Sequence, residues 1–88
     1  MSWVTTAGDL GFLIRERRRE RGLSQQRLAE AVGVSRQWIV AVEAGKDRAE
    51  IGLILRVLNV LDLRAGVQPR PPAAIDLDVL LTGAGSEP

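Results

Sequence analysis

Two short helical patterns flank a three-residue turn in residues 24–45, SQQRLAEAVGVSRQWIVAVEAG. Ser24 is expected to cap the first helix and Gly33 to end it, because serine accepts a hydrogen bond from the first turn and glycine tolerates positive φ. Ser35 is expected to cap the second helix, which ends at Gly45. A link this short makes the two helices cross steeply over a shared core. The rest of the chain must therefore fold around this pair.

Helical patterns also lie on both sides of the pair. Thr6 and Asp9 predict a capping box for a helix over residues 7–21, which ends at Gly22. The segment AEIGLILRVLNVLDL, residues 49–63, is long enough for a helix but too apolar for a single buried stripe. We expect one face of this helix, made of Ile51, Ile54, Leu55, Leu58 and Leu61, to pack on the core and a second face, made of Leu53, Val57 and Val60, to remain outside it.

This second apolar face predicts a partner, because a four-helix domain of 88 residues is too small to cover both faces by itself. LRAGVQP, residues 63–69, alternates apolar and polar side chains and ends at proline, as a short strand does. The chain has no second strand to pair with it, so we expect pairing with the symmetry mate in a homodimer. The predicted dimerisation residues are Leu53, Val57, Val60, Leu63, Ala65 and Val67.

Composition argues against enzyme activity and metal binding. The 88 residues include no cysteine, histidine or tyrosine. The chain therefore lacks the usual bases that activate a nucleophile and the usual ligands of zinc. We expect no catalysis, no metal and no cofactor. No apolar run approaches the roughly 20 residues of a membrane span, and the first residues do not have the pattern of a signal peptide, so a cytoplasmic location is predicted.

Positive charge is concentrated in the first half of the chain. Residues 1–48 carry nine Lys and Arg against six Asp and Glu, whereas residues 49–88 carry three against five. This balance suits binding to a polyanion, but it also suits an ordinary solvated surface. RERRRER, residues 15–21, allows the same two interpretations, and its interleaved glutamates favour ion pairs along a solvated helix face. Glu43 is expected to pair internally with an arginine of this first helix.

The outer face of the helix after Ser35 carries side chains suited to DNA. Helix, short turn and helix are the spacing of a helix-turn-helix, whose second helix enters the major groove. Arg36 and Gln37 are candidates for reading bases, since arginine pairs with guanine and glutamine with adenine. Gln25 can donate to a phosphate, and Trp38 either contacts DNA or covers the gap between helices. The predicted DNA-binding residues are Gln25, Ser35, Arg36, Gln37, Trp38, Val40, Ala41 and Lys46.

LSQQRLAEAVGVSRQWIVAVEAGK, residues 23–46, resembles the helix-turn-helix of the Cro/C1-type (xenobiotic-response-element) repressor family. VSRQWI, followed by AEIGLILRVLNVLDL and a short strand, resembles one branch, the HipB-type antitoxins. The resemblance implies an all-α fold of four to five helices with one short C-terminal strand in an intersubunit sheet. It also implies a HipA-like serine/threonine kinase toxin as partner and repression of the chain's own operon. Ala41 departs from the polar residue that many such repressors have there, which leaves only a methyl contact.

The chain is predicted to have two parts. Residues 1–69 form the DNA-binding and dimerisation domain, and residues 70–88 form a Pro-rich break, a short apolar segment IDLDVLL and a flexible tail. We expect the dimer to bind a palindromic operator as a repressor and antitoxin, with the toxin on residues 75–81 or on the outer faces of the dimer. Folding of that segment onto its own domain is the alternative. A free-standing phage or restriction-controller repressor and an adaptor that binds no DNA also remain open.

Overall fold

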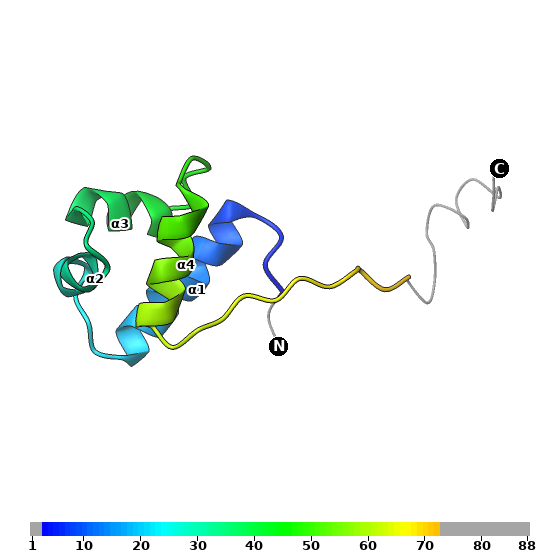
Figure 1. Ribbon diagram of the computed structural model, residues 1–88, viewed down its shortest axis with the longest axis horizontal. Helices are drawn as coiled ribbons and strands as arrows, with labels where there is room; N and C mark the ends of the chain where they lie inside the picture. The colour runs from blue at the N-terminus through cyan, green and yellow to red at the C-terminus, as the bar shows by residue number, and fades with distance from the viewer. Residues whose placement is uncertain (1–2, 73–88) are drawn as a thin grey trace.

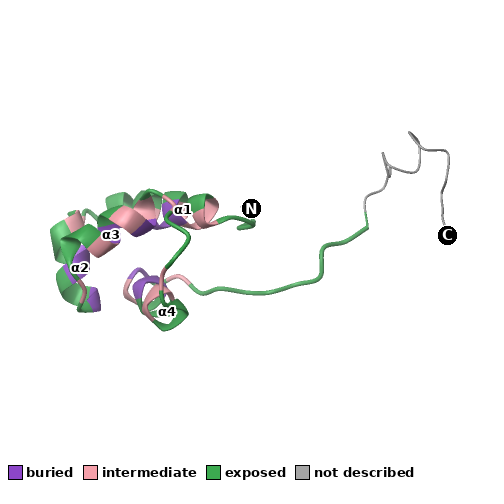
Figure 2. Cartoon of the chain, turned by 90° about the horizontal axis from the view of Figure 1, so that it is seen from above, coloured by how far each residue is buried: buried purple, intermediate pink, exposed green. Residues whose placement is uncertain are grey.

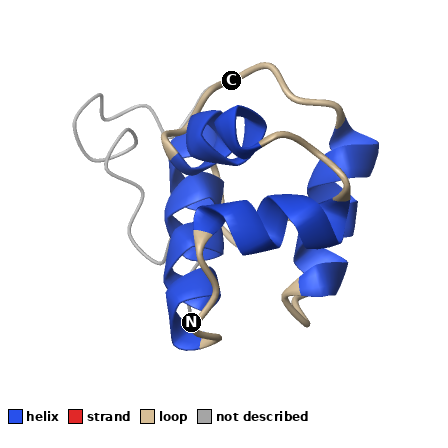
Figure 3. Ribbon diagram, turned by 90° about the vertical axis from the view of Figure 1, so that its left-hand side faces the viewer, coloured by secondary structure: helices blue, strands red, loops and turns tan. Residues whose placement is uncertain are grey.

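The computed structural model describes residues 3–72, and within that range it contains helices but no strand (Figures 1 and 3). The four helices are α1 (Ala7–Glu20), α2 (Gln25–Val32), α3 (Arg36–Glu43) and α4 (Ile51–Val60). α3 packs against both α1 and α2, and α4 packs against α2. The predicted all-α fold with four helices is confirmed. Among these residues, no helix has both the length and the apolar character needed to cross a bilayer.

Local capping explains where the first three helices begin. Thr6, Ser24 and Ser35 each accept, through the side-chain oxygen, a hydrogen bond from the backbone amide three residues later, at 2.9, 3.0 and 3.0 Å. The backbone amide and the hydroxyl of Thr5 donate to the Asp9 carboxylate at 3.0 and 3.1 Å. These bonds lower the pKa of Asp9, because they stabilise its charged form. The predicted helix starts are therefore confirmed.

All four helices contribute to one apolar core. Figure 2 shows the buried positions on the inner sides of the helices and the exposed positions outside. Leu10, Leu23 and Val34 are half-buried and pack against the edge of this core. The core consists of Ile14, Leu28, Ala29, Val32, Ile39, Val42, Val57, Leu58 and Leu61, each no more than 6% exposed.

Two arginines tie helix ends together through backbone carbonyls. Arg17 Nε donates to the Leu61 carbonyl oxygen at 2.8 Å, which joins α1 to the end of α4. Arg56 Nη1 donates to the Val32 carbonyl oxygen at 3.1 Å, which joins α4 to the end of α2. The last carbonyls of a helix have no intrahelical donor, so a guanidinium satisfies them well. These two arginines therefore serve the fold.

The rotation of α4 differs from the prediction. Val57 was expected to face a partner, but it is completely buried in the chain's own core, so that assignment is wrong. Ile51 and Leu55 were expected in the core, yet they are 75% and 45% exposed. A helix that is apolar on almost every side has few polar positions that reveal its rotation. α4 nevertheless leaves an apolar surface uncovered, made of Ile51 and Leu55. The half-buried Leu53 and Val60 lie on the opposite flank of the helix, and their expected dimer contacts stay a prediction.

After α4 the chain leaves the helices as an extended segment (Figure 1). Leu63 is half-buried, and every later described residue is exposed, including Val67 at 98%. Residues 63–72 form no strand in the single chain. The intersubunit strand, with the dimer contacts expected of Leu63, Ala65 and Val67, therefore stays a prediction. The apolar segment 75–81 lies outside the described residues.

Candidate nucleic-acid interface

The outward side of α3 is the centre of the candidate site. Ile39 and Val42 are buried on its inner side. Arg36 and Gln37 are exposed at its first turn, and Val40 is 40% exposed one turn further on. This is the face that helical periodicity predicted to point away from the core. The structure thus presents two long polar side chains together at the amino-terminal end of a solvent-facing helix.

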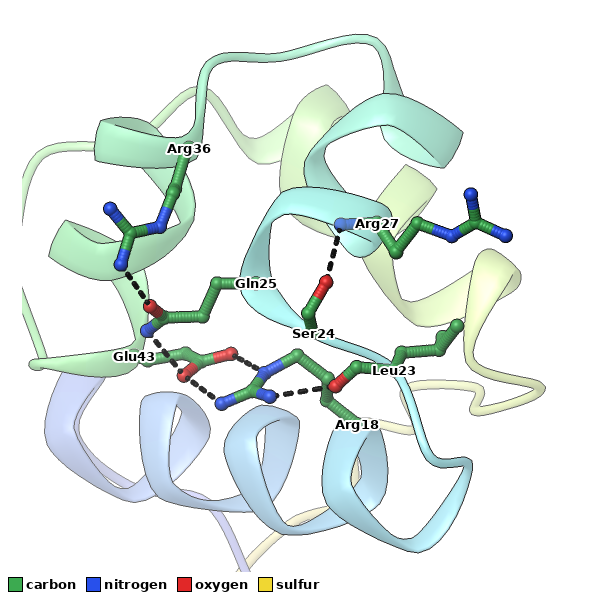
Figure 4. Close-up of polar contacts among 7 residues, drawn as sticks. All are labelled: Arg18, Leu23, Ser24, Gln25, Arg27, Arg36 and Glu43. Atoms are coloured by element: carbon green, nitrogen blue, oxygen red, sulfur yellow. Dashed lines mark hydrogen bonds and ion pairs between the residues drawn. The ribbon is translucent and has the colours of Figure 1, made fainter.

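A chain of hydrogen bonds connects the start of α3 to the interior (Figure 4). Arg36 Nη2 donates to Gln25 Oε1 at 3.5 Å, and Gln25 Nε2 donates to Glu43 Oε1 at 3.2 Å. Arg18 donates to both Glu43 oxygens, from Nε at 2.6 Å and from Nη2 at 3.0 Å. Arg18 Nη1 also donates to the Leu23 carbonyl oxygen at 2.8 Å. The network therefore joins α1, the start of α2 and both ends of α3.

The ion pair at the base of this network is almost completely shielded from solvent. The Arg18 and Glu43 side chains are 9% and 4% exposed. The hydrogen bonds to Glu43 raise the pKa of Arg18, and this outweighs the opposite effect of burial. The predicted internal pair between Glu43 and an arginine of the first helix is confirmed. Because the Glu43 carboxylate is neutralised in this way, it does not oppose the approach of a polyanion.

Gln25 is the first residue of α2, and its hydrogen bonds to Glu43 and Arg36 orient its side-chain amide. Nε2 uses one hydrogen for Glu43, while Oε1 accepts from Arg36. An amide nitrogen carries two hydrogens, and the second has no recorded acceptor among residues 3–72. The first backbone amides of a helix likewise lack intrahelical acceptors and suit an anion. This placement is consistent with the predicted phosphate contact, which stays a prediction.

A groove of about 620 Å³ runs between α1 and the α2–α3 pair. It includes Arg15 and Arg19, for which the interleaved glutamates predicted a solvated face of the first helix. Both are exposed, but they border the same groove as the candidate DNA-binding residues. Their four-residue spacing was the available signal, since it places them on one side of a helix. The groove is lined by Arg15, Arg18, Arg19, Ser24, Gln25, Gln26, Arg36, Val40, Glu43 and Ala44.

The remaining predicted DNA-binding residues lie around α3. Ser35 is exposed and caps α3, and Ala41 is half-buried. Lys46 is exposed in the loop that follows α3. Trp38 is half-buried, packs against the core and borders a hollow beside Leu53. This packing favours the interpretation that Trp38 covers the gap between helices, and its DNA contact stays a prediction.

Comparison with known proteins places this geometry in a family. A family profile described as a helix-turn-helix domain matches residues 9–70. The chain belongs to the Cro/C1-type helix-turn-helix family. This helix-turn-helix protein is therefore a DNA-binding transcriptional regulator, and its family is not one of enzymes.

Relatives of the helix-turn-helix regulator support the same family. It is 45% identical over 58 residues to an uncharacterized HTH-type transcriptional regulator of Sinorhizobium fredii, which covers 66% of this chain and 76% of the relative. The restriction-modification controller protein C.AhdI from Aeromonas hydrophila is 33% identical, with a TM-score of 0.61, over 66% of this chain and 84% of that one. A chain of a HipA-HipB-O2-O3 complex has a TM-score of 0.73 over 81% of this chain and 100% of that one. Its identity is only 18%, so this likeness shows the fold alone.

Proposed function

We propose that the regulator is a repressor that binds a palindromic operator as a homodimer, with α3 in the major groove. The observation that carries this proposal is the exposed Arg36–Gln37 pair at the first turn of α3, beside the oriented amide of Gln25. The amino-terminal end of a recognition helix is where side chains contact base edges. Arginine and glutamine supply the bidentate geometry that distinguishes guanine and adenine. Gln25 supplies a sequence-independent contact to the DNA backbone.

We expect Arg36→Ala or Gln37→Ala to weaken binding to the operator by about 1–3 kcal/mol, because each loses a bidentate base contact. Each change also relaxes specificity at one base pair. Gln25→Ala is the matched comparison, and it weakens binding to all sequences alike. Fluorescence anisotropy titrations compare the DNA upstream of the gene with a random duplex of equal length. Equal losses on both duplexes for Arg36→Ala would contradict base reading by this residue.

The uncovered apolar surface of α4 supports the proposed homodimer. Ile51 and Leu55 are exposed and lie one turn apart on the helix. Burial of these side chains against a second copy would remove them from water. We expect the double change Ile51→Glu and Leu55→Glu to leave a folded monomer at micromolar concentration, as measured by light scattering. We also expect this monomer to have a lower affinity for the operator, because one dimer no longer binds both half-sites at once.

Phe12→Glu is the control for this dimer test. Phe12 lies on α1 and is 59% exposed, so the change also places a carboxylate on an exposed apolar residue. We expect this control variant to remain a dimer, with the same molar mass in light scattering as the unaltered protein. An unaltered protein that is itself a monodisperse monomer at micromolar concentration would contradict the dimer.

Two more specific roles are compatible with such a repressor. The sequence resemblance to HipB-type antitoxins supports a HipA-like kinase toxin as partner. The 33% identity to C.AhdI, a restriction-modification controller protein, supports a controller that works without a toxin. Co-expression with the product of the neighbouring gene, followed by pull-down, separates the two roles. Recovery of a bound kinase supports the antitoxin, whereas a neighbouring restriction enzyme that forms no complex supports the controller.

A further inference from the structure

We propose that Arg15 and Arg19 of α1 hold a backbone phosphate of bound DNA in the groove that they share with Gln25 and Arg36. This inference rests on the proposed function and extends its contact surface from α2 and α3 to the first helix. The contact would be independent of sequence. It would add affinity and salt dependence without adding base discrimination.

The two arginines differ from the other basic residues of α1 and from Arg21, which directly follows this helix. Arg17 pairs with Glu20 at 3.4 Å, Arg18 pairs with Glu43, and Arg21 pairs with Asp62 at 2.9 Å. Within residues 3–72, no ion pair or side-chain hydrogen bond is recorded for either Arg15 or Arg19. Like charges four residues apart on a helix repel each other. Among the described residues, therefore, no carboxylate pairs with either guanidinium, and both groups can bind an anion.

The groove itself offers these arginines no counter-charge. Glu43 is the only carboxylate among its described lining residues, and its two oxygens already accept hydrogen bonds from Arg18 and Gln25. Arg36 adds a further guanidinium to the lining. A concave surface with unmatched positive charge concentrates anions. Guanidinium groups match the geometry of phosphate oxygens and bind them by two parallel hydrogen bonds.

Continuity with the reading face favours DNA as the source of the phosphate. Arg36 and Val40 line the groove and are also exposed on α3. When a recognition helix enters the major groove, the phosphates that border it come to lie against the residues flanking that helix. Ser24 and Gln25 occupy this flank, and Arg15 and Arg19 border the groove beside them. A DNA backbone that contacts the start of α2 therefore also lies against α1.

The test compares two charge-matched double variants by fluorescence anisotropy. Arg15→Gln/Arg19→Gln removes the proposed site, whereas Arg64→Gln/Arg70→Gln removes two exposed arginines from the segment after α4, outside this groove. We expect the first variant to bind the upstream DNA and a random duplex more weakly by the same factor. Between about 50 and about 200 mM salt, the affinity of the unaltered protein should fall about tenfold more than that of this variant. This is the effect expected when each of the two copies in the proposed dimer loses one phosphate contact, two contacts in all.

Several outcomes distinguish failure of this inference from failure of the proposed function. If the unaltered protein binds DNA and Arg15→Gln/Arg19→Gln keeps its salt dependence, the phosphate site is overturned and the proposed function stands. If the variant instead loses only capture of a neighbour-encoded protein, the groove serves a protein and the inference is also overturned. If the unaltered protein binds neither duplex, both proposals fail. Arg15→Lys/Arg19→Lys keeps the charge, so it should restore the salt dependence while circular dichroism checks the fold.

Discussion

We expect the replacement of Arg18 by alanine to lower the free energy of unfolding by about 3–5 kcal/mol, since it leaves a buried carboxylate without its partner. The Glu43 side chain is 4% exposed and accepts two hydrogen bonds from Arg18. This loss is large compared with the free energy of unfolding of a typical native protein, which is about 5–15 kcal/mol. Urea denaturation followed by circular dichroism measures it. A variant as stable as the unaltered protein would show that the pair contributes nothing.

The double variant Arg18→Met/Glu43→Leu separates stability from function. Removing both charges leaves no unpaired group in the interior, so we expect most of the lost stability to return. Gln25, however, loses the acceptor that orients its amide. The double variant should therefore fold but bind all DNA sequences more weakly. Binding equal to that of the unaltered protein would mean that the ion pair does not position Gln25.

We expect Gly11→Ala to destabilise the domain by about 1–3 kcal/mol, as overpacking of a core does. Gly11 is buried where α1 meets the end of α3. An added Cβ would overlap the Val42 carbonyl oxygen and lie 2.8 Å from the carbonyl oxygen of Glu43. Both contacts are with backbone atoms, which cannot rotate away, so α1 and α3 must separate. Thermal denaturation measures the effect.

Gly8→Ala is the matched control for this prediction, because Gly8 lies on the same helix. A Cβ at Gly8 would lie 3.7 Å from Thr6 Oγ1, which is an ordinary contact. Alanine at a helical position is more stable than glycine by about 0.5–1 kcal/mol. We therefore expect the control to raise the melting temperature slightly. A Gly11→Ala variant with the same melting temperature as the Gly8→Ala control would contradict the close packing of α1 on α3.

Local signals explain why the helices and the outward face of α3 were predictable. The caps at Ser24 and Ser35 and the glycine stop at Gly33, where φ is 88°, each depend on a few neighbouring residues. The buried Ile39 and Val42 then determine which side of α3 is solvent-facing. The exposure of Arg36 and Gln37 follows from that periodicity. None of these features requires knowledge of distant contacts.

The parts that were not predictable depend on tertiary packing. Periodicity could not establish the rotation of α4, and Val57 was assigned to the wrong side. The sequence indicated that Glu43 pairs with an arginine of the first helix, but not with which one. Arg15 and Arg19 join Gln25 in one groove only because α1 and the start of α2 are brought together by the fold. Neighbouring residues in the sequence carry no such information.

Selection of bound DNA from a pool of random duplexes about three helical turns long tests whether a dimer reads DNA through α3. We expect a two-fold symmetric sequence whose half-sites lie about 34 Å apart, which is about one helical turn, or a multiple of this spacing. Selection with Arg36→Ala should lose the preference at one base pair in each half-site. Recovery of sequences with no common motif, or of a single asymmetric half-site, would contradict a dimer that reads DNA through α3.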